Sequence, residues 1–545
     1  MLYSEIQVQE GSDCMQKGDA VSNQISKVEC DNVEVYSIPG VNKPAELRKS
    51  FSLWSVLGVG FGLTNSWFGL SVSMVTGISS GGPMMIIYGI VIIALISVCV
   101  GVSLGELSSA YPHAGGQFWW SLQLAPNKYK RLAAYLCGSF AWAGSVFASA
   151  SSTLSTTRLL LGMYALVHPS LEIKDWHVFV CYQALHMFLL LFNCHGRPLP
   201  LISSTALYVS LFSFITITIT VLASSHGNFN DAKFVFANFR NETGWESNTI
   251  AFIVGLINPA WSFSCLDCAT HMAFEVEKPE TVIPTAILGT VAIGFLTSIV
   301  YCIAMFFSIR DLDGILSSTT GAPILDIYYQ ASGSKACAIV LGSLVLLTSF
   351  TCVTSCHTWQ ARLCWSFARD NGFPYSRIWA KVNTELGVPL NAHLLSCAVI
   401  SLLGVLYLAS STAFNALVTG CISFLLLSYT VPVICLLLKQ RNIKRGPFWL
   451  GKFGTFSNYV LLAWTLFSLV FFSLPPMKPI TKGNMNYVSI VILSYLLYSI
   501  LYWKFSGHKK FYIYQEKIPV EESDERAEID DPNSKLQKIP THSNI

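Results

Sequence analysis

Residues 255–279 read GLINPAWSFSCLDCATHMAFEVEKP, and they place an acidic side chain, Asp267, in the middle of a mostly apolar stretch whose other charges, Glu275, Glu277 and Lys278, lie at its end. A carboxylate in the middle of a membrane span costs roughly 2.5 to 3.5 kcal/mol on insertion scales, so such residues usually face a cavity or a partner. Two interpretations are open at this point. Asp267 serves a functional site, or it is protonated and donates one hydrogen bond inside a packed interior.

The composition around this stretch is that of a membrane protein. Of the 545 residues, 52% are hydrophobic and 12% are charged, whereas soluble domains carry about 25% charged residues. Apolar runs of about 20 residues, each long enough to cross a hydrocarbon core as a helix, recur along the chain. The sequence therefore predicts an all-α polytopic membrane protein and excludes a soluble globular one.

Twelve transmembrane helices are predicted within a transporter domain that covers residues 47–505. The tails, residues 1–46 and 506–545, are polar or charged, which predicts disorder. Their exposed Lys and acidic runs also suit recognition by the ubiquitin ligase machinery, although a merely solvated end has the same composition. The predicted spans are 54–78, 83–106, 131–155, 176–194, 200–223, 250–272, 283–307, 336–361, 389–409, 412–437, 455–475 and 486–503.

Lys and Arg are unevenly divided between alternate loops. Short cytosolic loops carry an excess of these residues, so the division predicts that both termini are cytosolic. The sequon Asn241-Glu-Thr243 falls in a loop that this topology places outside, which makes Asn241 the candidate glycosylation site, although a single sequon also arises by chance. The predicted cytosolic loops hold Lys128, Lys130, Arg131, Arg362, Arg369, Arg377, Lys381, Lys439, Arg441, Lys444, Arg445 and Lys452.

Few functions remain for twelve spans joined by short loops. The sequence has no GxxxxGK[ST] motif for ATP, and no haem, zinc or nucleophile constellation stands out. The pair Cys265 and Cys268 matches C-x-x-C, but a lone pair without further ligands is weak evidence for a metal. No catalytic residue, cofactor, metal or nucleic-acid partner is expected. The chain is predicted to be a secondary transporter and not an enzyme.

Two predicted spans contain interruptions at corresponding positions, five spans apart. In transporters built from inverted repeats, Gly- or Pro-interrupted spans at matching positions mark the substrate site. Span one contains the glycine-rich run 58–69, and span six contains Gly255 and the pair Asn258-Pro259. The alternative is that these small residues permit close packing of helices.

Aromatic side chains accompany both interruptions. Ring faces attract an ammonium group by about 0.5 to 2 kcal/mol each, but aromatic residues make up 13% of the chain and many belong to interfacial belts. The rings near the breaks are Trp67, Phe68, Phe140, Trp142, Phe147, Trp261, Phe263 and Trp359.

Four stretches together carry a resemblance to a known family. The run FSLWSVLGVGFGLTNSWFGLSVSMVTGISSGGP (51–83), with GELSSAYPHAGGQFWWS (105–121), WQARLCWSFARDNGFP (359–374) and TGAPILDIY (320–328), resembles the fungal choline/ethanolamine permeases. These belong to the amino acid/choline branch of the amino acid/polyamine/organocation superfamily. The resemblance runs from Leu47 to Trp503.

The resemblance implies two inverted five-helix repeats plus two further helices, with spans one and six discontinuous. It also implies uptake of choline, and of ethanolamine, across the plasma membrane by alternating access. In related antiporters an aromatic residue that stacks on a cationic substrate precedes a proton-coupling acid by six residues. That pattern falls on Trp261 and Asp267, while Glu106 matches an acidic position at the cytosolic gate and Arg362 matches a loop motif after span eight.

Together these observations define a candidate site. The trimethylammonium group is expected against Trp261 and Trp67, with Trp142 and Phe147 as further candidates. Asp267 is expected to supply the compensating charge, and Thr64 or Asn65 to reach the hydroxyl. The candidate binding residues are Thr64, Asn65, Trp67, Trp142, Phe147, Trp261, Phe263 and Asp267; the candidate coupling or gating residues are Asp267, Glu106 and Arg362.

Three questions stay open in the sequence. Span five lacks the Lys that replaces a coupling sodium in many amino-acid permeases, which leaves both proton symport and uptake driven by the membrane potential alone. The substrate is choline or another amine, such as GABA or a polyamine. The last alternative is a nutrient sensor that signals without transporting.

Overall fold

The computed structural model describes residues 28–30, 33–35, 52–170, 172–318, 320–409, 413–481 and 484–512. The chain divides into two units, of which residues 47–514 form the larger. In the smaller unit, β1 (Val28–Cys30) and β2 (Val33–Val35) pair antiparallel with Val28 opposite Val35. Apart from these strands and residues 506–512, the tails predicted to be disordered and to meet ubiquitin ligases lie outside the described residues.

The larger unit consists of helices, and among its described residues ten are long and apolar enough to cross a membrane. They match ten of the twelve predicted spans in order and position. These helices are α4 (Gly82–Ala110), α6 (Lys130–Val167), α7 (Asp175–Phe192), α8 (Leu199–Ser224), α12 (Pro279–Phe307), α15 (Lys335–Arg369), α17 (Leu390–Ala409), α18 (Ala413–Leu438), α19 (Lys452–Phe471) and α20 (Val488–Tyr502).

Shorter elements connect the long helices. Residue 502 leads directly into the π-helical turn η2 (Trp503–Gly507) and α21 (His508–Lys510). The remaining connecting helices are α5 (Gln117–Leu124), α9 (Ala232–Phe236), α13 (Leu312–Leu316), α14 (Pro323–Ser332) and α16 (Ser376–Trp379).

The first predicted span is broken into α1 (Leu53–Thr64), α2 (Ser66–Val72) and α3 (Met74–Ser79). The break falls at Asn65, whose left-handed backbone (φ 36°, ψ 63°) ends α1. Asn adopts this conformation more readily than most side chains because its short amide can bond locally. The glycine-rich run predicted a break here, but an asparagine makes the turn.

The sixth predicted span is broken as well. It comprises α10 (Asn248–Gly255), α11 (Ile257–Ser262) and the 3₁₀ helix η1 (Cys268–Glu275). Between α11 and η1 the chain is not helical, and Cys265 has a positive φ of 65°. Both interruptions that the sequence predicts are therefore present.

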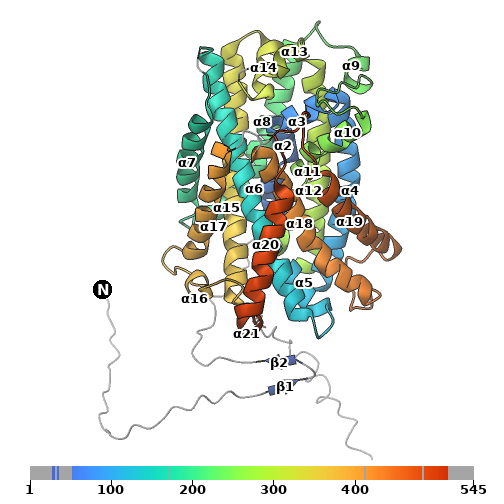
Figure 1. The fold of residues 1–545 in the computed structure, drawn as a ribbon, viewed down its shortest axis with the longest axis vertical. Helices are drawn as coiled ribbons and strands as arrows, with labels where there is room; N and C mark the ends of the chain where they lie inside the picture. The colour runs from blue at the N-terminus through green and yellow to red at the C-terminus, as the bar shows by residue number, and fades with distance from the viewer. Residues whose placement is uncertain are drawn as a thin grey trace, which may run out of the picture. The chain divides into compact units, whose positions relative to one another are not determined.

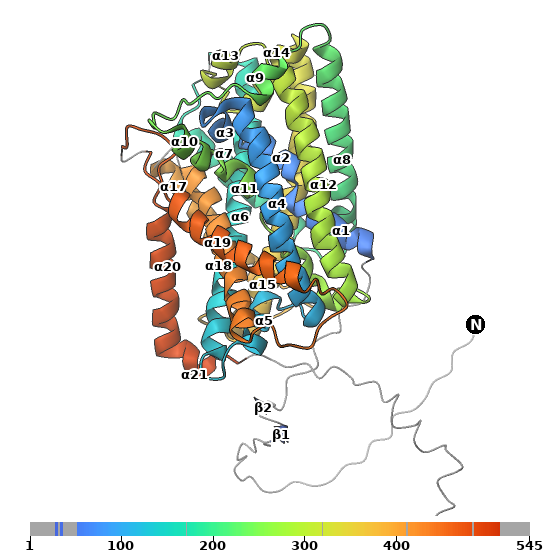
Figure 2. The ribbon, with the colours of Figure 1, turned by 90° about the vertical axis from the view of Figure 1, so that its right-hand side faces the viewer.

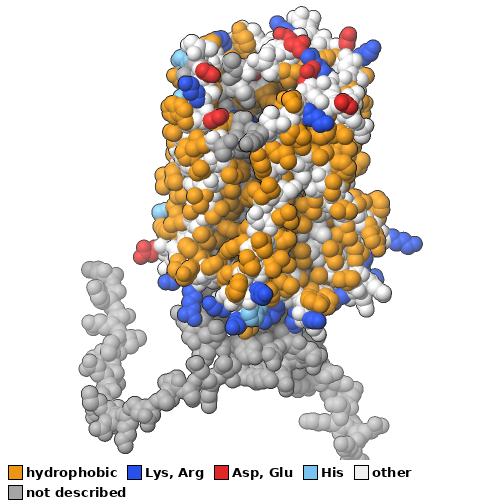
Figure 3. All heavy atoms as spheres, in the orientation of Figure 1, with side chains coloured by type: hydrophobic (Ala, Val, Ile, Leu, Met, Phe, Trp, Pro, Cys, Tyr) orange, Lys and Arg blue, Asp and Glu red, His pale blue; other side chains and the backbone are white. Residues whose placement is uncertain are grey.

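The two broken segments meet inside the bundle, because α11 packs against α2. Figures 1 and 2 show both among the long helices, of which α6 packs along α15 and α18 while α4 packs along α12. Large apolar side chains such as Leu95, Leu201 and Leu402 are at least 66% exposed, and Figure 3 shows a broad apolar surface along the sides of the molecule. A multi-pass membrane protein buries such a surface in lipid.

Candidate functional site

A small cavity lies where the two broken segments meet. The end of α1, the start of α2 and the end of α11 form one part of its wall, and α6 and α15 form the rest. Among the described residues that line it, none carries a charge. The lining consists of Leu63, Thr64, Phe68, Gly69, Ala148, Ser152, Trp261, Ser262, Ser264, Cys265, Cys352 and Cys356.

Two aromatic side chains and one hydroxyl group in the cavity wall are available to contact a ligand. Trp261 from α11 and Phe68 from α2 both reach the wall. Thr64 adds a buried hydroxyl whose Oγ1 has no hydrogen-bond partner. A buried polar atom without a partner costs about 1 to 3 kcal/mol, so a ligand that bonds to Thr64 recovers part of that cost.

The backbone adds a partial negative charge at the same place. Both α1 and α11 end at the cavity, so the carbonyl ends of their dipoles lie beside it. A helix C-terminus carries about half a negative charge. The start of α2 lies in the same wall and carries the opposite partial charge, so the suitability of the cavity for a cation rests on its aromatic rings together with the carbonyl ends of α1 and α11.

Trp261 is held in place by two contacts on its periphery. Its indole Nε1 donates to Ser151 Oγ at 3.2 Å. Its ring meets Phe414 nearly edge-on, with centroids 6.0 Å apart and planes at 82°. The ring is thus fixed against α6 and α18 before any ligand enters.

Trp67 and Asn65 lie outside the cavity lining, although the sequence placed both in the site. Trp67 Nε1 donates to Ser210 Oγ at 2.8 Å, and Ser210 donates to Asn65 Oδ1 at 3.0 Å. The Trp67 ring packs on Tyr301 with centroids 5.2 Å apart. In this conformation both side chains hold the α1–α2 turn against α8 and α12.

Three further aromatic candidates also pack between helices. Trp142 Nε1 donates to Ser396 Oγ on α17 at 3.1 Å. Phe147 lies against Phe424 on α18 with centroids 5.4 Å apart. Phe263 is buried at the end of α11. None of the three lines the cavity, whereas Phe68, which the site prediction left out, does.

Asp267 lies in a fully buried hydrogen-bond network next to the cavity. Gln117 Nε2 donates to its Oδ2 at 2.6 Å, and Tyr429 Oη donates to its Oδ1 at 2.6 Å. His271 Nε2 lies 3.2 Å from Oδ2. The carboxyl group therefore links α5, α18 and η1, and it is not part of the cavity wall.

His271 makes contacts through both ring nitrogens. Its Nδ1 lies 2.9 Å from the carbonyl oxygen of Ala114, and a carbonyl only accepts, so Nδ1 is placed to donate. The contact between Nε2 and Asp267 Oδ2 is a hydrogen bond when a proton lies on either of the two groups. The two side chains are therefore placed to share a proton.

A second cavity is lined by residues of η1 and α15, among them His271 and Arg362. Arg362 on α15 forms an ion pair with Glu275 at the end of η1, with Nη1 to Oε1 3.0 Å. This pair joins two elements that also line the second cavity. Trp359 lies in the same wall.

Glu106 forms a separate ion pair. Its Oε2 lies 2.6 Å from Arg441 Nη2, and its Oε1 accepts from the backbone N–H of Leu450 at 2.8 Å. Glu106 is fully buried. The contact ties α4 to the segment that joins α18 and α19.

Asn241 lies in the connection before α10, where its amide is engaged. Its Nδ2 donates to the Trp245 carbonyl at 2.8 Å, and its Oδ1 accepts from the Thr243 hydroxyl at 2.6 Å. The two sequon side chains are therefore bonded to each other in the folded protein.

The hydrogen-bond partners of Asp267 differ in how far they could be predicted from the sequence. His271 follows Asp267 by four residues, which is the spacing of neighbours on a helical face, so it was open to prediction. Gln117 and Tyr429 are separated from Asp267 by 150 and 162 residues. No sequence pattern connects residues so far apart.

A cavity at two broken helices inside a bundle of membrane-spanning length defines a transporter of the secondary type. Residues 51–495 match the amino acid permease family. The chain belongs to this family, whose members are permeases and not enzymes.

Relatives within the family differ in the substrates that their names record. A choline transporter of Saccharomyces cerevisiae is 72% identical over 486 residues, which cover 89% of this chain and 86% of the relative. A 7-keto 8-aminopelargonic acid transporter of the same yeast is 35% identical over 81% of this chain and 90% of the relative. A swainsonine transporter of Arthroderma benhamiae is 33% identical over 86% and 93%.

Proposed function

We propose that this protein imports choline, and also ethanolamine, across the plasma membrane by alternating access. The observation that carries the proposal is the uncharged cavity in which Trp261 and Phe68 meet the carbonyl ends of α1 and α11. Rings and carbonyl dipoles attract a quaternary ammonium, which has no N–H to donate. The 72% identity to a choline transporter supports the same substrate.

In this conformation the cavity has a volume of about 20 Å³, room for about one water molecule, so choline needs it to widen during the transport cycle. The trimethylammonium group then lies between Trp261 and Phe68. The hydroxyl of choline donates to Thr64 Oγ1 or accepts from it, which satisfies the unpartnered buried atom. GABA also carries a carboxylate, which would face the carbonyl ends of α1 and α11 and would need N–H donors such as those at the start of α2. Choline needs no such donors and is favoured over GABA.

Asp267 and His271 carry the coupling proton in this proposal. The two side chains are placed to share a proton, and His271 is also part of the wall of the second cavity. Tyr429 on α18 and Gln117 on α5 donate hydrogen bonds to the carboxyl group. A change in the charge of that group therefore changes how firmly it holds these two helices. Asp267 thus acts on the transport cycle through its network, without touching the substrate in this conformation.

Two ion pairs serve as gates at one end of the bundle. Arg362–Glu275 closes the second cavity, and Glu106–Arg441 fastens α4 to the α18–α19 connection. Opening toward that side requires the first pair to separate. The Glu106–Arg441 pair is shielded from water, so its charges attract more strongly than those of a surface pair, whereas Arg362 of the first pair is 28% exposed.

The topology that accompanies this mechanism has twelve spans in two inverted five-helix repeats with two further helices. The segments α1–α3 and α10–η1 supply the two spans that are not single long helices. Lys and Arg gather at the lower end of the molecule in Figure 3, which supports a cytosolic position for that end. Asn241 then faces outward and carries the glycan.

Uptake by the purified full-length protein in liposomes tests this function. We expect radiolabelled choline to enter under an inside-negative potential, which contributes about 2.3 kcal/mol per 100 mV for a monovalent cation. An acidic exterior should raise the rate further, and ethanolamine should compete while GABA and polyamines should not. Absence of choline uptake under both gradients, with choline still bound, would identify a sensor instead of a carrier.

A further inference from the structure

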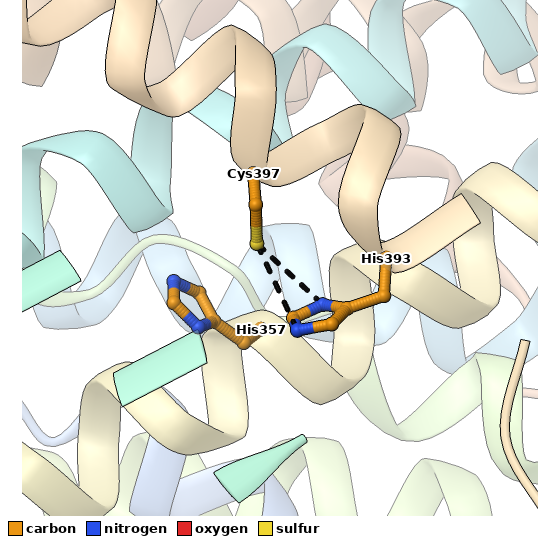
Figure 4. A group of neighbouring side chains, drawn as sticks. All are labelled: His357, His393 and Cys397. Carbon is orange, nitrogen blue, oxygen red and sulfur yellow. Dashed lines mark hydrogen bonds between the residues drawn. The ribbon is translucent and has the colours of Figure 1, made fainter. Parts of the chain in front are cut away.

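A second cluster of buried polar side chains lies where α15 meets α17, and the proposed transport cycle uses none of them. It consists of His357 on α15 with His393 and Cys397 on α17, which point toward one another (Figure 4). All three are at most 2% exposed. One ligand atom from each lies within 4.8 Å of the other two.

Both ring nitrogens of His393 lie near Cys397 Sγ, Nδ1 at 3.6 Å and Nε2 at 3.8 Å. Its Nε2 lies 3.1 Å from the Leu190 carbonyl oxygen, which accepts only, so Nε2 carries the hydrogen. In the neutral ring Nδ1 then offers a lone pair, 3.6 Å from Cys397 Sγ. Metal-binding histidines are held in the same way, with the other N–H donated to a carbonyl or carboxylate.

His357 is the observation that points to a missing ligand. It is fully buried, and neither of its ring nitrogens has a hydrogen-bond partner among the described residues. Its ring centroid lies 5.7 Å from that of His393. Buried polar groups in folded proteins are nearly always paired, so an imidazole with two free nitrogens requires a partner that the protein itself does not provide.

Gln360 is a fourth polar side chain beside His357, His393 and Cys397. Gln360, three residues after His357, directs Nε2 toward Cys397 Sγ at 3.8 Å, while its Oε1 has no partner. A metal ion held by three side chains has room for a fourth donor. The oxygen of Gln360 or a water molecule suits that position.

The donor set has the chemistry of a thiophilic d¹⁰ ion. Two imidazole nitrogens and a thiolate suit Zn²⁺, whose bonds of 2.0 to 2.3 Å separate tetrahedral ligand atoms by about 3.5 Å. The distance of 3.6 Å between Cys397 Sγ and His393 Nδ1 meets that requirement. A thiolate also suits Cu⁺, and with Cu⁺ the site is electrically neutral, which lowers the cost of burying it among membrane helices.

We propose that His357, His393 and Cys397 bind one thiophilic d¹⁰ cation, Zn²⁺ or Cu⁺, which fastens α15 to α17. The site affects the transporter because the residue before His357, Cys356, lines the first cavity. A bound ion thus restrains the α15 wall of that cavity. The proposal does not depend on the identity of the transported substrate.

Metal content of the purified full-length protein provides the test. After exposure to Zn²⁺, or to Cu⁺ under reducing conditions, and removal of free ion on a desalting column, the wild type should retain about one equivalent by elemental analysis. The Cys397→Ser variant keeps the shape of the side chain but lacks the thiolate. It should bind at least about tenfold more weakly, since even residues that only orient a ligand contribute that much.

Cys435→Ser, which changes a buried cysteine on α18 outside the cluster, is the matched control and should retain the ion. Substitution with Co²⁺ adds a readout that a folding defect does not imitate, because a thiolate–Co²⁺ charge-transfer band should appear in the wild type and in Cys435→Ser but not in Cys397→Ser. Retention of either ion in this pattern supports the site, and competition between the two identifies which ion fits it. Failure of the wild type to retain either ion, or equal loss in Cys397→Ser and Cys435→Ser, would overturn the proposal.

Discussion

Trp261 and Asp267 are six residues apart on the same broken segment, yet their surroundings differ in kind. Trp261 borders a cavity in which the hydroxyl of Thr64 has no partner. Both oxygens of Asp267 are bonded to protein side chains, and this residue lines neither of the two cavities described above. The difference teaches that a residue beside a helix break does not contact a ligand for that reason alone. A ligand is expected where buried polar groups near the break have no hydrogen-bond partner in the protein.

The largest effect is expected for Trp261→Ala. Loss of one desolvated cation–π contact of about 2 kcal/mol should raise the KM for choline about 30-fold. Initial rates of choline uptake in liposomes measure this change. Trp176→Ala, at a tryptophan that is 56% exposed on α7, is the control and should keep the wild-type KM. An unchanged KM in Trp261→Ala would remove the ring from the site.

A smaller effect of another kind is expected for Asp267→Asn. The amide retains one acceptor but presents N–H groups to a donor, so at least one hydrogen bond is lost and the maximal rate should fall about tenfold. The KM should stay within about threefold of the wild type, because no contact with choline is lost. Stimulation by an acidic exterior should also disappear. Asp175→Asn, at an exposed carboxylate on α7, should change none of these quantities.

Thr64→Val tests the cavity that Trp261 borders, by removing the hydroxyl that has no partner there. Removal of one hydrogen bond worth about 1 kcal/mol should raise the KM for choline about fivefold. Tetramethylammonium lacks the hydroxyl group, so its inhibition constant should be the same in Thr64→Val and in the wild type. Equal weakening of both compounds would show that Thr64 shapes the cavity without bonding to the substrate.

The smallest effect on transport is expected for His113→Gln, a change in the connection between α4 and α5. Burial, followed by the charges of Arg369 and His271, lowers the pKa of His113 to about 3, so this residue stays neutral while the pH dependence of uptake is measured. The pH profile of uptake should therefore match the wild type, unlike that of Asp267→Asn. A changed profile would assign part of the coupling to the connection between α4 and α5.

The same pKa predicts a change in stability with a definite sign. His113 in the unfolded chain takes up a proton as the pH falls through about 6.5, whereas in the folded protein it does so only near 3. The wild type therefore loses stability over that interval, and His113→Gln does not lose this contribution. In thermal unfolding in detergent, the unfolding temperature of His113→Gln should fall less than that of the wild type as the pH is lowered from neutral.

Much of the fold could be predicted, because a transmembrane span is recognised from the apolar residues of one continuous stretch of sequence. The apolar run 83–106 became α4 (Gly82–Ala110), and the polar and small residues of 250–272 marked the second break. The first break was placed within a run of glycines, but Asn65 makes the turn. Length and hydropathy locate a helix, whereas the residue that leaves the helical conformation depends on its neighbours in space.

The candidate site was predicted less completely. Of the predicted binding residues, Thr64 and Trp261 line the first cavity, while Trp67 contacts α8 and α12. The left-handed turn at Asn65 resets the helical phase, so the face on which Trp67 lies does not follow from its spacing to Thr64. Phe68 occupies the wall instead. The partners of Asp267 come from α5 and α18, and only the folded chain brings them together.

Equilibrium binding of radiolabelled choline to the purified protein tests the central claim most directly, because it separates contact with the substrate from the transport cycle. The account predicts that Trp261→Ala binds choline about 30-fold more weakly, whereas Asp267→Asn binds it within about threefold of the wild type. The opposite pattern, with binding abolished in Asp267→Asn and retained in Trp261→Ala, would contradict it and make the carboxylate the direct partner of the ammonium group.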